Sequence, residues 1–432
     1  MWQHIHYLLL ILLVMRLKSK KSLSINTSFQ PLLYKKNGDS NIKLINLDKV
    51  DIFSPYIIVV AIAIYVALAM LGYNYHIRNL QWASTTTFIY VIFGTIIFII
   101  GATVPKIITY YSPGIKSTLK RENITQKKPS FWYSKLKILL DERILLSIVI
   151  IALILQAINL YLLGGIPLLN GYLKFRATTD LWMVSYILFL PALNLLLAKY
   201  PSKRYYILFV IGLALFAIDG YRTTALAIIF SVIITTYYIQ RIQTRYIILS
   251  IILAAVIGVI LGYIAVKSIE WQTWVLNPLQ LLFYRAGFTM MVLDKIVHMP
   301  GFTGGELFHQ ALTGGHPRVT VGQVVLGYHY NVSTPTVSIT STIFGPAILD
   351  FGALGLAVQM FLLGLILRLM HSAQKIANGA YTALYAIILA HTAIWVETGP
   401  TDGIVWIFYG LAVISLLIFA NNIFHMSSKS AI

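Results

Sequence analysis

Two residues able to do chemistry stand together in an otherwise uncharged apolar run. In "AIDGYRTTAL", Asp219 and Arg222 are the only charged residues between positions 205 and 238. The planar, permanently charged guanidinium of Arg222 suits phosphate, with Asp219 as the group that orients it. Alternatively, the two side chains pair across one helical turn and only stabilise a hairpin.

Further basic residues are expected on the same face of the membrane. Lys174 and Arg176 end "GGIPLLNGYLKFR", Arg285 lies in "LLFYRAGF" and Arg318 lies in "GGHPRVT". We assign all four to substrate binding, because convergence of the three arginines with Arg222 would form a pyrophosphate clamp. Alternatively, Arg176 contacts lipid headgroups and Arg285 extends its charge to the membrane interface.

Candidate proton acceptors lie in two segments. His316 precedes Arg318 by two residues, and a histidine there can take a proton from an acceptor hydroxyl. In "WVETGPTDG", Glu397 and Asp402 could bind sugar hydroxyls or act as the base, although Asp402 could equally cap a helix. The chain has no cysteine, and its histidine spacing fits no standard zinc site, so we expect neither a metal nor a cofactor.

The elements that must position these residues are membrane helices. Of 432 residues, 58% are hydrophobic and 11% are charged, and apolar runs recur along the chain. This pattern predicts an all-α polytopic membrane protein, with an N-terminal arm at 1–51 and a transmembrane domain at 52–432. Ten spans are expected: 52–72, 84–104, 144–163, 182–197, 205–218, 223–239, 246–266, 348–367, 381–396 and 404–420.

The basic residues set the expected orientation. Lys and Arg concentrate in alternate segments between the spans, which places both termini in the cytoplasm and the excess charge of +19 on the inner face. The charge therefore gives no reason to expect nucleic-acid binding. The residues 267–347 form one large outer loop, too long for a simple connector, in which we expect short helices lying over the membrane.

At these residues the chain resembles the oligosaccharide repeat-unit polymerases, the Wzy-type O-antigen polymerases. The similarity rests on "GGIPLL…R" ending at Arg176, on the "GYRT" turn with Arg222, and on "TPTVSITSTIFGPAILDFGALG" before a late span. It covers the chain from about residue 52 onward. By this resemblance, Arg176 and Arg222 correspond to outer-loop arginines of the family that would hold phosphates or glycan. Arg318 and His316 are matched to the family as well.

The resemblance implies a GT-C-like glycosyltransferase at the plasma membrane, with its active site outside. Such an enzyme moves a glycan from a polyprenyl-pyrophosphate carrier, undecaprenyl or dolichyl, to the non-reducing end of another lipid-linked repeat, without a metal ion. Membrane lipids and a chain-length regulator would be its other partners.

Three rival functions are considered. A metal-dependent transferase would carry acids in its first outer loop, but "GYNYHIRNLQWAS" has none. A ligase would share the donor and the architecture and differ only in the acceptor. A transporter or flippase is disfavoured, because charges are scarce within the spans and no inverted repeat is visible.

Overall fold

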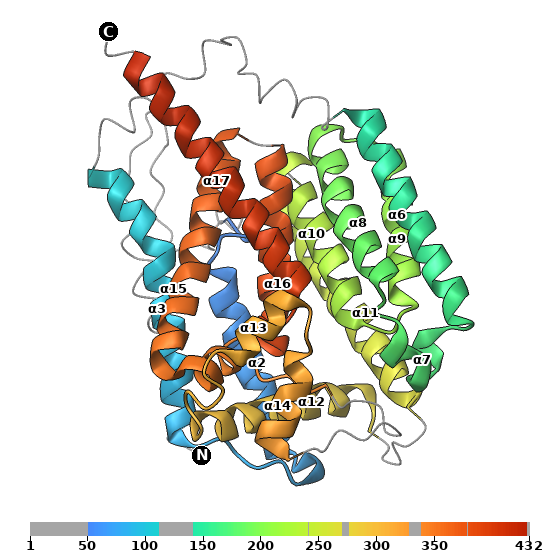
Figure 1. Cartoon of the computed structure of the whole chain (residues 1–432), viewed down its shortest axis with the longest axis vertical. Helices are drawn as coiled ribbons and strands as arrows, with labels where there is room; N and C mark the ends of the chain where they lie inside the picture. Colours follow the sequence, from blue (N-terminus) through green and yellow to red (C-terminus); the bar gives the residue numbers. More distant parts are fainter. Residues whose placement is uncertain are drawn as a thin grey trace, which may run out of the picture. The chain divides into compact units, whose positions relative to one another are not determined.

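The computed structural model describes residues 51–111, 141–240, 242–269, 276–327, 338–377 and 379–429. Within these ranges all regular secondary structure is helical (Figure 1), and the chain from Phe53 onward forms one compact unit. The predicted arm at 1–51 lies, apart from its last residue, outside the described residues. The prediction of an all-helical polytopic membrane chain is thus confirmed for the described part.

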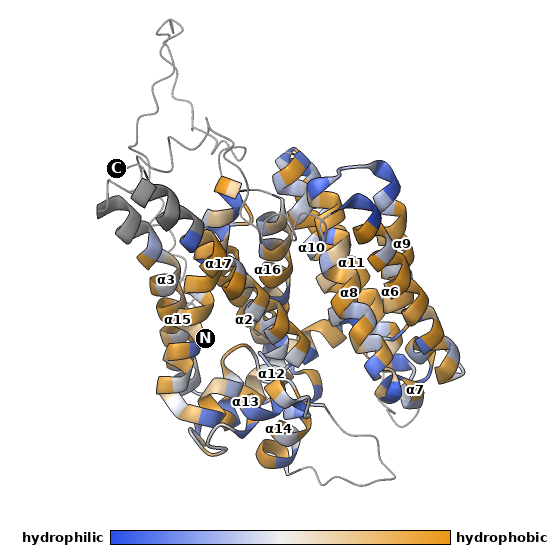
Figure 2. Ribbon diagram, turned by 45° about the horizontal axis from the view of Figure 1, so that its top comes forward, coloured by the Kyte–Doolittle hydropathy of each residue, from blue (hydrophilic) through white to orange (hydrophobic). Residues whose placement is uncertain are grey.

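Nine of the described helices are long and apolar enough to cross a membrane. They are α2 (Ile57–Asn74), α3 (Thr85–Tyr111), α6 (Glu142–Leu163), α8 (Asp180–Lys199), α10 (Arg222–Gln240), α11 (Thr244–Lys267), α15 (Gly345–Ala377), α16 (Ala380–Thr398) and α17 (Gly403–Lys429). Figure 2 shows hydrophobic residues along these helices and hydrophilic residues gathered near their ends.

The expected span at 205–218 differs from the other nine. It forms α9 (Lys203–Ala217), a helix of only 15 residues. At 1.5 Å per residue α9 extends about 22 Å, whereas the hydrocarbon core of a bilayer is about 30 Å thick. The helix is short because a turn at 218–220 ends it, with Gly220 in the left-handed region at φ 76°. The turn carrying Asp219 therefore lies less than a full span from the basic start of α9.

The helix α16 lies at the centre of the unit. Of its most apolar stretch 67% is buried, compared with 22% for α11, whose exposed leucines and isoleucines suit contact with lipid. It packs against α10, α15, α8 and α17. A functional side chain on α16 is therefore held by several helices at once.

The segment 267–347 contains three described helices: α12 (Pro278–Val297), α13 (Glu306–Thr313) and α14 (Pro317–Leu326). Together with the short α7 (Gly171–Arg176), α12 and α14 lie at the lower end of the long helices in Figure 1. Asp350 of α15 holds α13 in place, because its carboxylate accepts hydrogen bonds from the backbone N–H of Leu307 (3.0 Å) and of Phe308 (2.8 Å). The loop is thereby anchored to a membrane helix.

One backbone carbonyl joins α2, α10 and α16 at the ends of these helices that lie away from α12 and α14. The Phe53 oxygen, just before α2, accepts a hydrogen bond from Tyr238 of α10 (3.1 Å) and one from Tyr385 of α16 (2.5 Å). Buried tyrosine hydroxyls normally find such partners. This shared contact fixes the heights of α2, α10 and α16 relative to one another.

Candidate anion-binding site

Two predicted arginines converge on one predicted acid. Arg222, the first residue of α10, donates a hydrogen bond from Nη2 to Oε1 of Glu397, near the end of α16. Arg285, in α12, donates to the same oxygen from 3.3 Å. The side chains of Arg222, Arg285 and Glu397 are 18%, 34% and 22% exposed, so a ligand can reach them.

Lys174 of α7 belongs to the same group. Burial, and then the charges of Arg285 and Arg222, lowers the pKa of its ammonium to about 8. Its backbone carbonyl accepts a hydrogen bond from the hydroxyl of Tyr221 (2.8 Å), the residue next to Arg222. We name Lys174, Arg222, Arg285 and Glu397 the cationic cluster.

Small residues make room for the cluster. A Cβ atom at Gly262 of α11 would lie 3.1 Å from Cδ of Arg222, so the arginine lies directly along this helix. A Cβ atom at Gly220 would lie 3.2 Å from Cα of Leu168, whose N–H donates to the carbonyl of Ile218 (2.7 Å). The loop before α7 thus packs on the α9–α10 turn and brings Lys174 to Arg222.

The charge of the cluster is unbalanced. Arg222 and Arg285 use the same oxygen atom of one carboxylate, and Lys174 adds a third positive charge beside the two arginines. Arginine pairs bind phosphate oxygens through parallel N–H bonds, and partial burial strengthens such contacts by excluding water. The arrangement can therefore bind a ligand that carries about two negative charges.

Asp219 is not the partner of Arg222. Its side chain is fully buried, and Oδ2 accepts a hydrogen bond from Gln156 of α6 (2.8 Å). The Oδ1 atom faces the indole of Trp182 without a hydrogen bond of normal geometry. Burial raises the pKa of Asp219 to about 8, so the carboxyl is mostly protonated at neutral pH. Arg222 pairs with Glu397 and not with Asp219, and the orienting role expected of Asp219 stays a prediction.

Arg318 forms a separate, balanced pair. It lies in α14, donates from Nη2 to Oδ2 of Asp402 (2.6 Å) and from Nε to the hydroxyl of Thr401 (2.8 Å). Burial raises the pKa of the Tyr221 phenol, and the charge of Arg318 opposes this rise, so Arg318 also lies near the α9–α10 turn. The side chain of Asp402, considered above as a helix cap, is engaged by Arg318.

The two remaining predicted residues form no hydrogen bond or ion pair with the cluster among the described residues. The guanidinium of Arg176 lies over the ring of Tyr172, 4.4 Å from its centroid, and both side chains are exposed. His316 precedes α14 as its N-cap residue and is exposed. Of the four arginines expected to converge, Arg222 and Arg285 do so.

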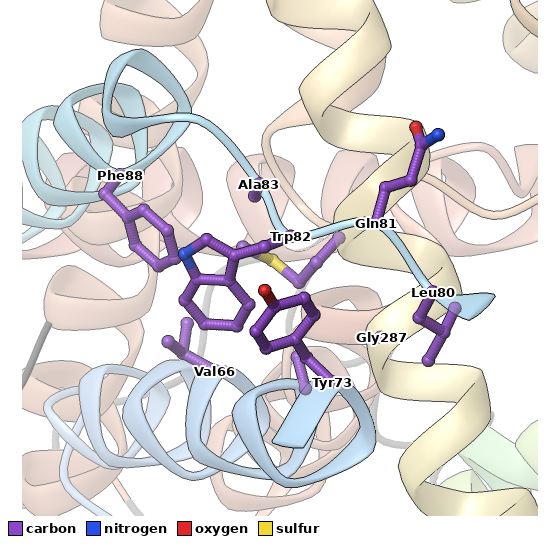
Figure 3. Close-up of a pocket in the computed structure, with 10 residues that line it drawn as sticks. Val66, Tyr73, Leu80, Gln81, Trp82, Ala83, Phe88 and Gly287 are labelled. Carbon is purple, nitrogen blue, oxygen red and sulfur yellow. The ribbon is translucent and has the colours of Figure 1, made fainter. Parts of the chain in front are cut away.

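A pocket lies on another side of α12. Its lining comes from α2, α3, α12 and the segment between α2 and α3, and includes the aromatic side chains of Tyr73, Trp82 and Phe88 (Figure 3). None of the residues that line it belongs to the cationic cluster. Among the described residues, no group of three His, Cys, Asp or Glu side chains could hold a metal ion.

The fold and the site together define a class: a polytopic helical membrane protein with a cationic cluster near one end of its spans. Residues 51–409 match the model of the family described as "Putative O-antigen polymerase". The chain belongs to this family, which confirms the resemblance stated from its motifs.

Two relatives come from Methanocaldococcus jannaschii. The uncharacterized protein MJ0420 is 32% identical over 292 residues, which are 67% of this chain and 65% of the relative. The uncharacterized protein MJ0419 is 26% identical over 273 residues, 61% of this chain and 73% of the relative. The chain thus spans about two thirds of MJ0420. No solved structure matches it.

Proposed function

We propose that the protein polymerises lipid-linked oligosaccharide repeat units at the outer face of the plasma membrane. It would transfer a glycan from a polyprenyl-pyrophosphate carrier to the non-reducing end of another lipid-linked repeat. The observation that carries this proposal is the cationic cluster, whose excess positive charge suits a pyrophosphate. Membership of the O-antigen polymerase family supports the same substrate class.

In the proposed reaction the cluster holds the leaving group. The acceptor hydroxyl attacks the anomeric carbon, a new C–O bond forms, and the bond from that carbon to the phosphate oxygen breaks. Negative charge grows on the departing pyrophosphate, where Arg222, Arg285 and Lys174 would stabilise it. The hydroxyl proton goes to a base, for which exposed His316 is our candidate.

The acids and the other arginines have supporting roles in this proposal. Glu397 stays ionised between two arginines and orients them. Buried Asp219 holds the α9–α10 turn against α6. Arg318 fixes α14 to the residues that follow Glu397. Exposed Arg176 is placed to contact the phosphate of the second lipid-linked substrate. The proposal also includes the orientation of the chain, with both termini in the cytoplasm. It further includes a chain-length regulator as a partner.

Arg222 provides the test. Purified protein, lipid-linked single repeats and a chelator should yield a ladder of glycan lengths, and Arg222→Ala should reduce elongation at least a hundredfold. Arg222→Lys should recover little, because a point charge lacks the guanidinium fork. Arg204→Ala is the matched control, since Arg204 pairs with Glu142 in an exposed contact at the opposite end of α9 from Arg222.

Three outcomes separate the functions. A single transfer to a different acceptor would identify a ligase. An absence of any glycosidic product from the wild-type protein would exclude a transferase. Normal chain length in Arg222→Ala would exclude the cluster as the pyrophosphate site.

A further inference from the structure

A buried hydroxyl in α2 has no hydrogen-bond partner in the part of the chain that the structure describes. It belongs to Tyr65, in the middle of the apolar run "IIVVAIAIYVALAMLGYN". Buried side-chain polar atoms are nearly always hydrogen-bonded, so an isolated hydroxyl needs an explanation. A bound ligand that supplies the missing acceptor would be one.

The surroundings of Tyr65 point to the cationic cluster. Its hydroxyl interacts electrostatically with Glu397, Arg285 and Arg222, and it neighbours Thr289 of α12. The hydroxyl of Thr289 donates to the carbonyl of Arg285 (2.9 Å) and lies 3.3 Å from that of Thr340, and it makes no hydrogen bond of normal geometry with the Tyr65 hydroxyl. Among the described residues, the Tyr65 hydroxyl therefore lies near the cationic cluster without a hydrogen-bond partner of normal geometry.

The helix heights agree with this placement. Tyr65 lies 12 residues after Phe53, and Glu397 lies 12 residues after Tyr385, whose hydroxyl binds the Phe53 carbonyl. At 1.5 Å per helical residue, Glu397 stands about 18 Å along α16 from Tyr385, and Tyr65 is the ninth residue of α2, so both lie well along their helices from that shared contact. The α2 helix also meets α12 closely, since a Cβ atom at Gly72 would lie 2.4 Å from the carbonyl oxygen of Phe283.

We propose that the Tyr65 hydroxyl donates a hydrogen bond to a phosphate oxygen of the anion held by the cationic cluster. The inference rests on the proposed function, in which this anion is the pyrophosphate of the lipid carrier. A phenol contributes a directed donor without adding charge, so it selects the position of the phosphate oxygen. No bond is made or broken at Tyr65, which makes it a binding and positioning residue.

The test separates binding from folding. Full-length protein in nanodiscs is titrated with two probes, inorganic pyrophosphate and farnesyl diphosphate, and melted without ligand. Tyr65→Phe should weaken binding of both about tenfold or more, the usual effect of losing a hydrogen bond to a charged group. Its melting temperature should stay the same or rise, because the variant removes a buried polar atom that has no partner.

The matched control is Tyr409→Phe. The Tyr409 hydroxyl is also buried, but it lies 2.5 Å from the hydroxyl of Thr392. This variant should lower the melting temperature and leave probe binding unchanged. A Tyr65→Phe protein that binds both probes like the wild type would overturn the inference. A Tyr65→Phe protein that melts as early as the control would also overturn it, since the hydroxyl would then serve the fold.

The result also distinguishes this inference from the proposed function. Wild-type binding that Arg222→Ala abolishes and Tyr65→Phe leaves intact would refute only the assignment of Tyr65. Failure of the wild-type protein to bind either probe would refute both together.

Discussion

The cationic cluster and the Arg318–Asp402 pair use the same residue types in opposite proportions. In the cluster, Arg222 and Arg285 share the single carboxylate of Glu397, and Lys174 adds a third positive charge near them. In the pair, one arginine has one carboxylate and a threonine hydroxyl to itself. Excess positive charge would be stabilised by a bound anion, whereas a one-to-one ion pair has no excess charge to neutralise.

The two regions also differ in what they join. The cluster gathers side chains from α7, α10, α12 and α16, elements that are distant in sequence. The pair joins α14 to the short connection between α16 and α17. The comparison suggests a test: if the cluster binds an anion as proposed, the ratio of cations to acids, rather than the presence of arginine, distinguishes it from the Arg318–Asp402 pair.

The largest expected effect comes from removing the shared acid. Glu397→Gln leaves three cations close together without a counter-charge, so we expect the free energy of unfolding to fall by about 2–3 kcal/mol. Added pyrophosphate should restore most of this loss, because it supplies the missing negative charge. The measurement is thermal or denaturant unfolding, with and without pyrophosphate.

Glu142→Gln serves as the control for that experiment. Glu142 forms an exposed pair with Arg204, so its replacement should change stability little and pyrophosphate should restore nothing. If pyrophosphate failed to stabilise Glu397→Gln, the excess charge of the cluster would not serve anion binding.

A smaller effect is expected at the balanced pair. Arg318→Ala removes two hydrogen bonds and leaves Asp402 alone, which should lower the free energy of unfolding by about 1–2 kcal/mol. Pyrophosphate should bind this variant with unchanged affinity and should not restore the lost stability. Isothermal titration measures the affinity for pyrophosphate of Arg318→Ala and of Arg222→Ala. An equal loss of affinity in the two variants would show that Arg318 also contacts the ligand.

The smallest effect concerns the pH dependence of the cluster. The pKa of Lys174 is about 8 in the free protein, so its positive charge is present below pH 8 and is lost above it. We expect affinity for pyrophosphate to fall about tenfold from pH 7 to pH 9, because binding must then take up a proton. In Lys174→Arg the charge persists, and any remaining change reports the ligand's own ionisation. Equal pH profiles for the two proteins would remove Lys174 from the site.

Much of the fold could be predicted because the apolar runs are long. Hydrophobic length alone located nine helices that the structure contains. The predicted segment 205–218 was already short, and the structure has a helix of 15 residues there, α9. This helix ends at the turn containing Gly220, whose backbone is left-handed.

The site was predictable only in part. Charged residues in apolar surroundings identified Arg222, Arg285 and Glu397. Their pairing depends on contacts across 112 and 175 residues, which local sequence patterns do not encode. The proximity of Asp219 to Arg222 along the chain favoured the wrong partner. Nothing in the sequence indicates that the Tyr65 hydroxyl is buried without a partner among the described residues, because that depends on how α2 packs against the other helices.

The short α9 has a consequence for how a substrate finds the site. Lys203 and Arg204 begin this helix, as basic residues do at a membrane surface. Its other end, about 22 Å away, then stops some 8 Å short of the opposite surface, within the depth of the lipids. A carrier that diffuses within the bilayer would reach Arg222 by a search in two dimensions, with its isoprenoid chain never leaving the lipid. Encounter rates would then follow the density of carrier in the membrane rather than any concentration in water.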